Sequence, residues 1–80
     1  MPRTLSPWVG LAIRQRRTAS GLTQEQLAEK AELHRTYISM VERGKRNISV
    51  DALTGVAEAL KTSASQLVRT AERLRGTKSR

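Results

Sequence analysis

The 80-residue chain is long enough for one domain, and 15 Lys and Arg against 7 Asp and Glu give it a net charge of +8. A domain this basic favours a polyanionic partner, nucleic acid before an anionic membrane surface, although the charge could also serve solubility alone. The absence of cysteine excludes disulfides and thiolate metal sites and fits a reducing cytoplasm, and without a signal peptide or long apolar run we expect no membrane association.

Capping residues and apolar spacing predict five short helices and no strand. We predict that the first begins at Ser6, an N-cap before the first-turn proline Pro7, and ends at Gly21, a residue suited to a C-terminal cap. Val9 and Ile13 lie four residues apart, which gives this helix one inward stripe.

The second helix is predicted to begin at a capping box. Thr23 is followed three residues later by Gln26, so each can bond the backbone N–H of the other. Leu27, Ala28 and Ala31 then form the inner face of this helix.

A turn of two residues, Glu32 and Leu33, joins the second helix to a third, which Gly44 ends. Helix pairs with such a tight turn are typical of the helix-turn-helix, in which the first helix braces the second in a groove. With Ile38 and Val41 inward, the outer face of the third helix carries Arg35, Thr36 and Ser39, with Tyr37 and Met40 at its edges.

The outward side chains of this third helix suit a DNA major groove. An arginine can bond guanine through O6 and N7, hydroxyls can reach bases or phosphates, and a methionine can contact a thymine methyl group. Lys45, Arg46 and Asn47 follow the helix, close to where phosphates would pass.

Two further helices are predicted after this motif. The fourth begins at Ser49, and the fifth begins at a second capping box formed by Ser63 and Gln66. The predicted inward residues of the fourth helix are Leu53, Val56, Ala57 and Leu60.

The fifth helix is predicted to carry the dimer interface. Leu67 completes the core, whereas an apolar strip remains that one small domain can hardly cover. We predict that this strip, made of Val68, Ala71 and Leu74, forms a homodimer interface. Residues 76–80 (GTKSR) are interpreted as a basic disordered tail, so that the domain comprises residues 6–75.

Residues 21–60, GLTQEQLAEKAELHRTYISMVERGKRNISVDALTGVAEAL, resemble the phage-repressor (Xre-type, lambda-repressor-like) helix-turn-helix family, and the likeness extends over residues 9 to about 67. Within it, LHRTYIS with ERG and RNIS is most similar to the controller proteins of bacterial restriction-modification systems, small dimeric regulators without a separate effector domain. Free-standing regulators of other operons share these sequence motifs. The resemblance implies an all-α, five-helix DNA-binding domain.

The resemblance also implies roles for individual residues. It implies base contacts for Arg35, Thr36, Ser39 and Met40, and phosphate contacts for Gln24, Tyr37, Lys45, Arg46 and Asn47, of which Arg46 can also reach a base. Arg17 and Glu42 match a family ion pair that ties the first helix to the third. Glu25 and Glu29 match acidic residues that touch RNA polymerase in activating phage repressors.

Two positions depart from the family pattern. His34 stands where a short capping residue such as aspartate is common, and a histidine is a poorer N-cap that opposes the helix dipole when protonated. We interpret it as exposed and without a role, with phosphate contact as the alternative. Met40 stands where many controller proteins have glycine, which alters the surface facing the groove.

These observations predict a homodimeric, sequence-specific regulator that binds double-stranded DNA at palindromic operators, as a controller protein that both activates and represses. One alternative is an antitoxin that binds its toxin and autoregulates its operon; the neighbouring gene would discriminate the two. A pure interaction module would leave the +8 charge unexplained. With a lone histidine and no glycine-rich phosphate loop, we expect no enzyme, cofactor or small-molecule effector.

Overall fold

The computed structural model describes residues 4–78 of the chain, and within them it contains helices and no strand. The helices are α1 (Ser6–Ala19), α2 (Gln24–Ala31), α3 (Arg35–Glu42), α4 (Val50–Ala59) and α5 (Ala64–Lys78). The all-α architecture predicted from apolar spacing is therefore confirmed. None of these helices is long and apolar enough to cross a membrane.

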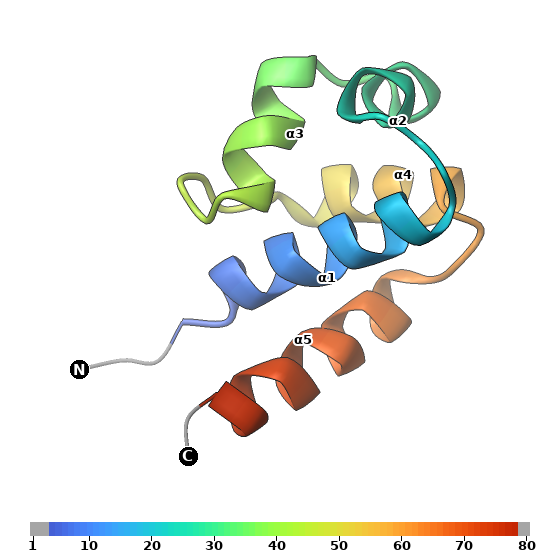
Figure 1. Cartoon of the computed structure of the whole chain (residues 1–80). Helices are drawn as coiled ribbons and strands as arrows, with labels where there is room; N and C mark the ends of the chain where they lie inside the picture. The colour runs from blue at the N-terminus through green and yellow to red at the C-terminus, as the bar shows by residue number, and fades with distance from the viewer. Residues whose placement is uncertain (1–3, 79–80) are drawn as a thin grey trace.

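Helix α1 lies between α3 and α5 (Figure 1), and it packs against both of them. Helix α2 packs on α3 and α4, and α4 in turn contacts α5. The helices surround one apolar core, as expected for a small domain that must bury one stripe of each amphipathic helix. The predicted inward residues that are buried in it are Val9, Ile13, Leu27, Ala28, Ile38, Val41, Leu53, Val56, Ala57, Leu60 and Leu67.

Local capping chemistry sets several of the helix ends as predicted. The hydroxyl of Thr23 accepts a hydrogen bond from the Gln26 backbone N–H at 3.0 Å, and the Gln26 side-chain oxygen accepts one from the Thr23 N–H at 2.9 Å. Ser49 Oγ accepts from the backbone N–H of Ala52 at 3.0 Å. Gly21, just beyond the end of α1, has φ +76°, the left-handed conformation that glycine adopts without a Cβ clash.

One predicted N-cap is wrong, and one predicted capping box is confirmed only in part. Ser6 is not a cap but the first residue of α1, because the carbonyl of Leu5 already accepts from the N–H groups of Trp8 and Val9, both at 3.0 Å. At the start of α5, Ser63 Oγ accepts from the Gln66 N–H at 3.1 Å and pairs with Ser65 Oγ at 3.0 Å. This is one of the two bonds of the predicted capping box.

The predicted apolar strip on α5 needs a correction. Ala71 is fully buried in the core of the single chain, because it follows the core residue Leu67 by four positions and so lies on the same helix face. Val68 and Leu74 are half-buried and pack against the core. Ala71 therefore cannot be an exposed part of a dimer interface, and the dimer role of the other two stays a prediction.

The C-terminal boundary also differs from the prediction. Helix α5 continues through residues 76–78, which were expected to be tail, and the hydroxyl of Thr77 donates to the Arg73 carbonyl at 3.0 Å inside it. A single glycine costs a helix only about 1 kcal/mol, so Gly76 does not end it. Residues 79 and 80 of the predicted tail lie outside the described residues.

Candidate nucleic-acid interface

The backbone of α3 lies very close to that of α1. A Cβ atom added to Gly10 of α1 would lie 1.9 Å from the carbonyl oxygen of Val41, so only glycine fits at this crossing. Ile38 and Val41 are 0% and 1% exposed and point from α3 into the core. The inner side of α3 is thus fixed by packing, which sets the direction of its outer side.

A buried network of polar groups ties α3 to α1 and α2. The Glu42 carboxylate receives two bonds from Arg17, Nε to Oε2 at 2.7 Å and Nη2 to Oε1 at 3.0 Å. Arg17 also donates from Nη1 to the Leu22 carbonyl at 2.8 Å. The hydrogen bond to Glu42 is the main cause of a raised pKa of Arg17. The ion pair that the family resemblance implied is confirmed, with Glu42 only 6% exposed.

Gln24 belongs to the same network. Its side-chain Nε2 donates to Glu42 Oε1 at 3.0 Å, and the residue is half-buried at the start of α2. The family resemblance implies only a phosphate contact for this residue. That contact stays a prediction; the backbone N–H groups of the first turn of α2 could still provide it.

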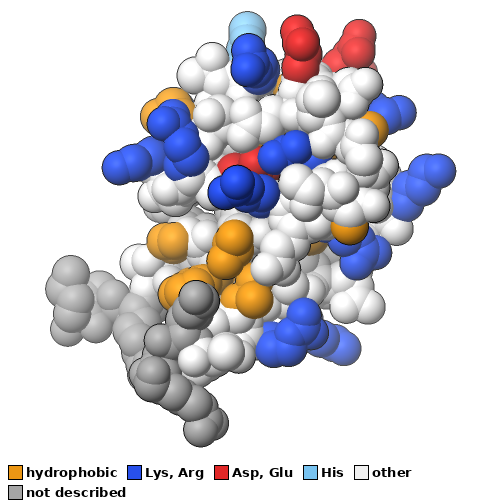
Figure 2. All heavy atoms as spheres, in the orientation of Figure 1, with side chains coloured by type: hydrophobic (Ala, Val, Ile, Leu, Met, Phe, Trp, Pro, Cys, Tyr) orange, Lys and Arg blue, Asp and Glu red, His pale blue; other side chains and the backbone are white. Residues whose placement is uncertain are grey.

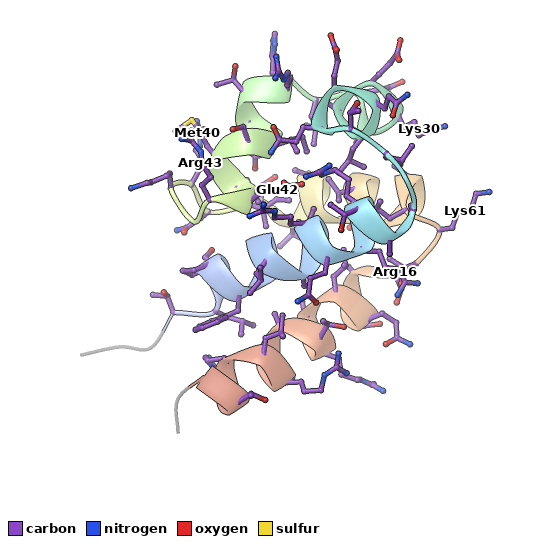
Figure 3. All side chains as sticks on the ribbon, viewed as in Figure 1. Arg16, Lys30, Met40, Glu42, Arg43 and Lys61 are labelled. Carbon is purple, nitrogen blue, oxygen red and sulfur yellow. The ribbon has the colours of Figure 1, made fainter. Side chains whose placement is uncertain are left out.

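The outer side of α3 is open to solvent. Arg35 and Thr36 are exposed, and Ser39 and Met40 are half-buried. Within residues 4–78, the side chains of Arg35 and Thr36 have no hydrogen-bonding partner. Figure 3 shows Met40 pointing away from the body of the molecule, whereas Glu42 on the same helix points back toward α1.

A glycine turn ends α3 and presents the basic residues that follow. Gly44 has φ +73°, its N–H donates to the Val41 carbonyl at 3.0 Å, and the Lys45 N–H donates to the Met40 carbonyl at 2.8 Å. These bonds satisfy the last carbonyls of the helix. The three residues after Gly44, namely Lys45, Arg46 and Asn47, are all exposed, and their contact with a DNA backbone stays a prediction.

Tyr37 connects α3 to this basic loop. Its hydroxyl accepts a hydrogen bond from the backbone N–H of Ser49 at 3.1 Å, and the Arg46 guanidinium carbon lies 5.2 Å from the centre of its ring. The second distance is within the range of a cation–π interaction. Sequence reasoning placed Tyr37 at the edge of the DNA-facing surface but missed that it anchors the loop.

Several predicted DNA contacts line one open groove beside α3. The groove has a volume of about 770 Å³, and its lining includes Thr36, Tyr37, Met40 and Arg46. Two predicted base contacts and two predicted phosphate contacts therefore lie side by side. The other predicted contacts do not line this groove; they are Arg35, Ser39, Gln24, Lys45 and Asn47.

Arg43 is an exposed cation that the sequence analysis did not select. It is the C-cap of α3, and its Nε lies 3.4 Å from the Ser39 carbonyl. Figure 3 shows it close to Met40 at the outer end of the helix. The sequence did contain a signal for Arg43: it directly precedes Gly44, the predicted end of the helix, and a helix C-terminus favours a cation.

The acidic residues Glu25 and Glu29 of α2 line a depression together with Arg35 of α3. Figure 2 shows acidic side chains gathered over α2 and basic ones over α3 and the loop that follows it. Glu25 and Glu29 are both exposed, and their contact with RNA polymerase stays a prediction. His34 is exposed too and makes no side-chain cap at α3, as expected for a poor N-cap.

The side chains gathered at the site are cations and hydrogen-bond donors. Among the described residues, no group of three or more His, Cys, Asp or Glu side chains could hold a metal ion. Guanidinium, ammonium, hydroxyl and amide groups instead gather on one side of a rigidly held helix. Such groups donate hydrogen bonds to phosphates and base edges.

Comparison with known proteins supports this description. The helix-turn-helix family matches residues 13–67. Control protein C.SmaI of Serratia marcescens is 48% identical over 56 residues, which span 70% of this chain and 67% of that protein. The structure of the restriction-modification controller protein C.AhdI from Aeromonas hydrophila matches with a TM-score of 0.74 at 41% identity, covering 76% of this chain and 92% of the other. The clp gene regulator ClgR from Corynebacterium glutamicum matches with a TM-score of 0.92 at 28% identity, covering 96% and 82%.

Proposed function

The chain belongs to the Xre-like helix-turn-helix family of DNA-binding transcription regulators, and we propose that it is the controller protein of a restriction-modification system. It binds palindromic operators as a homodimer, and it activates or represses according to which operators are filled. The likeness to control protein C.SmaI and to C.AhdI supports this role.

The observation that carries the proposal is the free outer side of α3. Arg35 and Thr36 are exposed and without partners in the described part of the chain, on a helix whose inner side is locked to α1. A helix presented in this way fits the major groove, about 12 Å wide. In this proposal the base-reading residues are Arg35, Thr36, Ser39 and Met40.

Phosphate contacts would supply most of the affinity, because they release counterions whatever the sequence. The candidates surround α3: Lys45, Arg46 and Asn47 on the loop, Tyr37 at its base and Gln24 at the start of α2. The cation–π contact with Tyr37 holds Arg46 beside the groove before DNA arrives. Less side-chain freedom is then lost on binding.

A homodimer would place two copies of α3 roughly 34 Å apart, one turn of DNA. Its surface would include the half-buried Val68 and Leu74 on α5. Val50, at the start of α4, is the one exposed large hydrophobic side chain of the described chain, at 78%, and it is a further candidate. Sedimentation equilibrium at micromolar concentration should show a dimer, and a mass that stays monomeric, also on operator DNA, would contradict it.

In its activating role, the regulator would touch RNA polymerase through Glu25 and Glu29. Both side chains are exposed on α2. The double variant Glu25→Lys/Glu29→Lys should bind the operator as well as the wild type does and lose activation. Full activation by this variant would refute the contact.

Footprinting on the DNA upstream of the chain's own gene tests the proposed function. We expect protected sites with two-fold symmetry and half-sites about 10 base pairs apart. A restriction enzyme and a methyltransferase gene should lie alongside. The absence of any symmetric protected site, or a neighbouring toxin gene in place of those two, would contradict the proposal.

A further inference from the structure

The positive charge of the chain is concentrated outside the helix-turn-helix. Residues 20–63, which contain α2, α3 and α4, hold six Lys and Arg and six Asp and Glu. The rest of the chain, which contains α1 and α5, holds nine Lys and Arg and one Glu. The net charge of +8 therefore comes entirely from the segments around α1 and α5, and contacts made by α3 and its loop do not account for it.

The basic part of α5 lies far from the outer side of α3. Helix α1 separates the two (Figure 1), and the Arg16 side chain lies on the side of α1 toward α5, well away from Met40 and Arg43 (Figure 3). Figure 2 shows basic side chains over α5 that are separate from those over α3. A straight duplex bound to the outer side of α3 would not reach them.

A groove between α1 and α5 gathers hydrogen-bond donors. Its rim carries Arg16 and Gln15 from α1, and Arg73, Gln66 and Thr70 from α5. Both arginines are exposed, and within residues 4–78 neither has an ion pair or a side-chain hydrogen bond. The acidic residue of α5, Glu72, is exposed but does not line the groove.

The chemistry of this groove matches a phosphate backbone better than a protein partner. Guanidinium, amide and hydroxyl groups are the side chains that most often bond DNA phosphates. A protein partner would also need aromatic or large apolar anchors beside the arginines. The apolar lining here is only Ala12, Ala19 and Leu67, of which Leu67 is 2% exposed.

We propose that the α1–α5 groove is a second, sequence-independent binding site for duplex DNA. Arg16 and Arg73 each contact a phosphate, and the neighbouring amides and hydroxyl add neutral hydrogen bonds. A regulator bound to its operator through α3 then holds a second DNA segment on its opposite side. This inference goes beyond the proposed function, since that function needs only one duplex for each dimer.

The test measures capture of a second duplex. The full chain is bound to an immobilised operator duplex until saturated, and a labelled random duplex is then added. The wild type should capture the random duplex. The variant Arg16→Gln/Arg73→Gln should bind the operator as the wild type does but should capture less of the random duplex. Removal of two phosphate contacts should lower the slope of log affinity against log salt by about 1.8. Capture by the wild type at 50 mM salt should therefore exceed capture by the variant about tenfold or more.

A matched control separates the groove from the overall charge. Lys30→Gln/Lys61→Gln removes the same two charges from exposed side chains that line a different depression, between α2 and the end of α4, and it should capture the second duplex like the wild type. Equal losses in both variants, no capture by the wild type, or equally strong capture of polyglutamate would overturn the proposal. If no operator is found, an immobilised random duplex replaces it, so that this test stays separate from the proposed function.

Discussion

The inner and outer sides of α3 have opposite environments. On the inner side, Ile38 and Val41 are almost completely buried, and the Glu42 carboxylate is satisfied by Arg17 and Gln24. At the start of the helix, about two turns from Glu42, the guanidinium of Arg35 is exposed and without a partner in the described part of the chain. One helix thus carries both the contacts that hold the fold and the groups that remain free for a ligand.

This contrast separates two kinds of polar residue that look alike in sequence. Arg17 and Arg35 are both arginines on short amphipathic helices, yet one is 11% exposed at its side chain and paired, and the other is open to solvent. Loss of a buried partner should reduce stability, and loss of an exposed donor should reduce only binding. Substitutions in and around α3 test that separation.

The substitution Glu42→Ala should have the largest effect on stability. It leaves the Arg17 guanidinium largely buried and without its carboxylate, which costs about 3–5 kcal/mol. For a small domain this is a large part of the free energy of unfolding. Urea unfolding should show it, whereas Glu29→Ala on the exposed side of α2 should change stability by less than about 0.5 kcal/mol. Equal stability of the two variants would show that the network does not hold the fold.

Gly10→Ala should be the next most damaging change. The added methyl group would meet the Val41 carbonyl at 1.9 Å, so α1 and α3 would have to separate, at a cost of about 3 kcal/mol. Gly76→Ala, which adds the same group to α5 where nothing lies within 4 Å, is the matched control. Thermal unfolding should show a large fall in Tm for the first and no fall for the second. Similar Tm values would contradict the close approach.

Variants of Tyr37 should separate its two contacts. Tyr37→Phe removes the bond from the Ser49 N–H, worth about 1 kcal/mol, and keeps the ring under Arg46. Tyr37→Leu removes both and loses about 0.5–1 kcal/mol more. Hydrogen exchange at the Ser49 amide should accelerate in both variants. If Tyr37→Leu binds DNA no more weakly than Tyr37→Phe does, the ring does not position Arg46.

Arg46→Ala should have the smallest effect, and it should weaken binding to all DNA sequences equally. If Arg46 contacts only phosphate, its loss weakens binding to every sequence and lowers the salt slope by about 0.9. Titrations of operator and random duplexes at several salt concentrations measure this slope. A loss confined to the operator would instead assign Arg46 a base contact.

The sequence predicted the local features well. The capping box at Thr23, the cap at Ser49 and the glycine ends of α1 and α3 depend on neighbouring residues, so they could be read from the chain. The pairing of Arg17 with Glu42 was available only through the family resemblance, because the two residues are distant in sequence and meet through the fold.

Features that depend on tertiary arrangement could not be predicted. Ala71 and Val68 both fitted an apolar strip, and only the packing of α5 against the core shows which of them is buried. The bond from Ser49 to Tyr37 depends on the path of the loop. The uneven distribution of charge was visible in the sequence. The position of the basic helix α5, on the other side of α1 from α3, was not.

The direct test of the account compares two DNA affinities for Arg35→Ala. We define the specificity ratio as the Kd for random duplex divided by the Kd for operator, both measured at one salt concentration. Loss of a bidentate base contact should cost about 1–3 kcal/mol of discrimination, so this ratio should fall roughly 5- to 150-fold. Specificity should relax at one base pair, and Tm should be unchanged. An equal loss of affinity for both duplexes, with the ratio preserved, would contradict the claim that the outer side of α3 reads the DNA sequence.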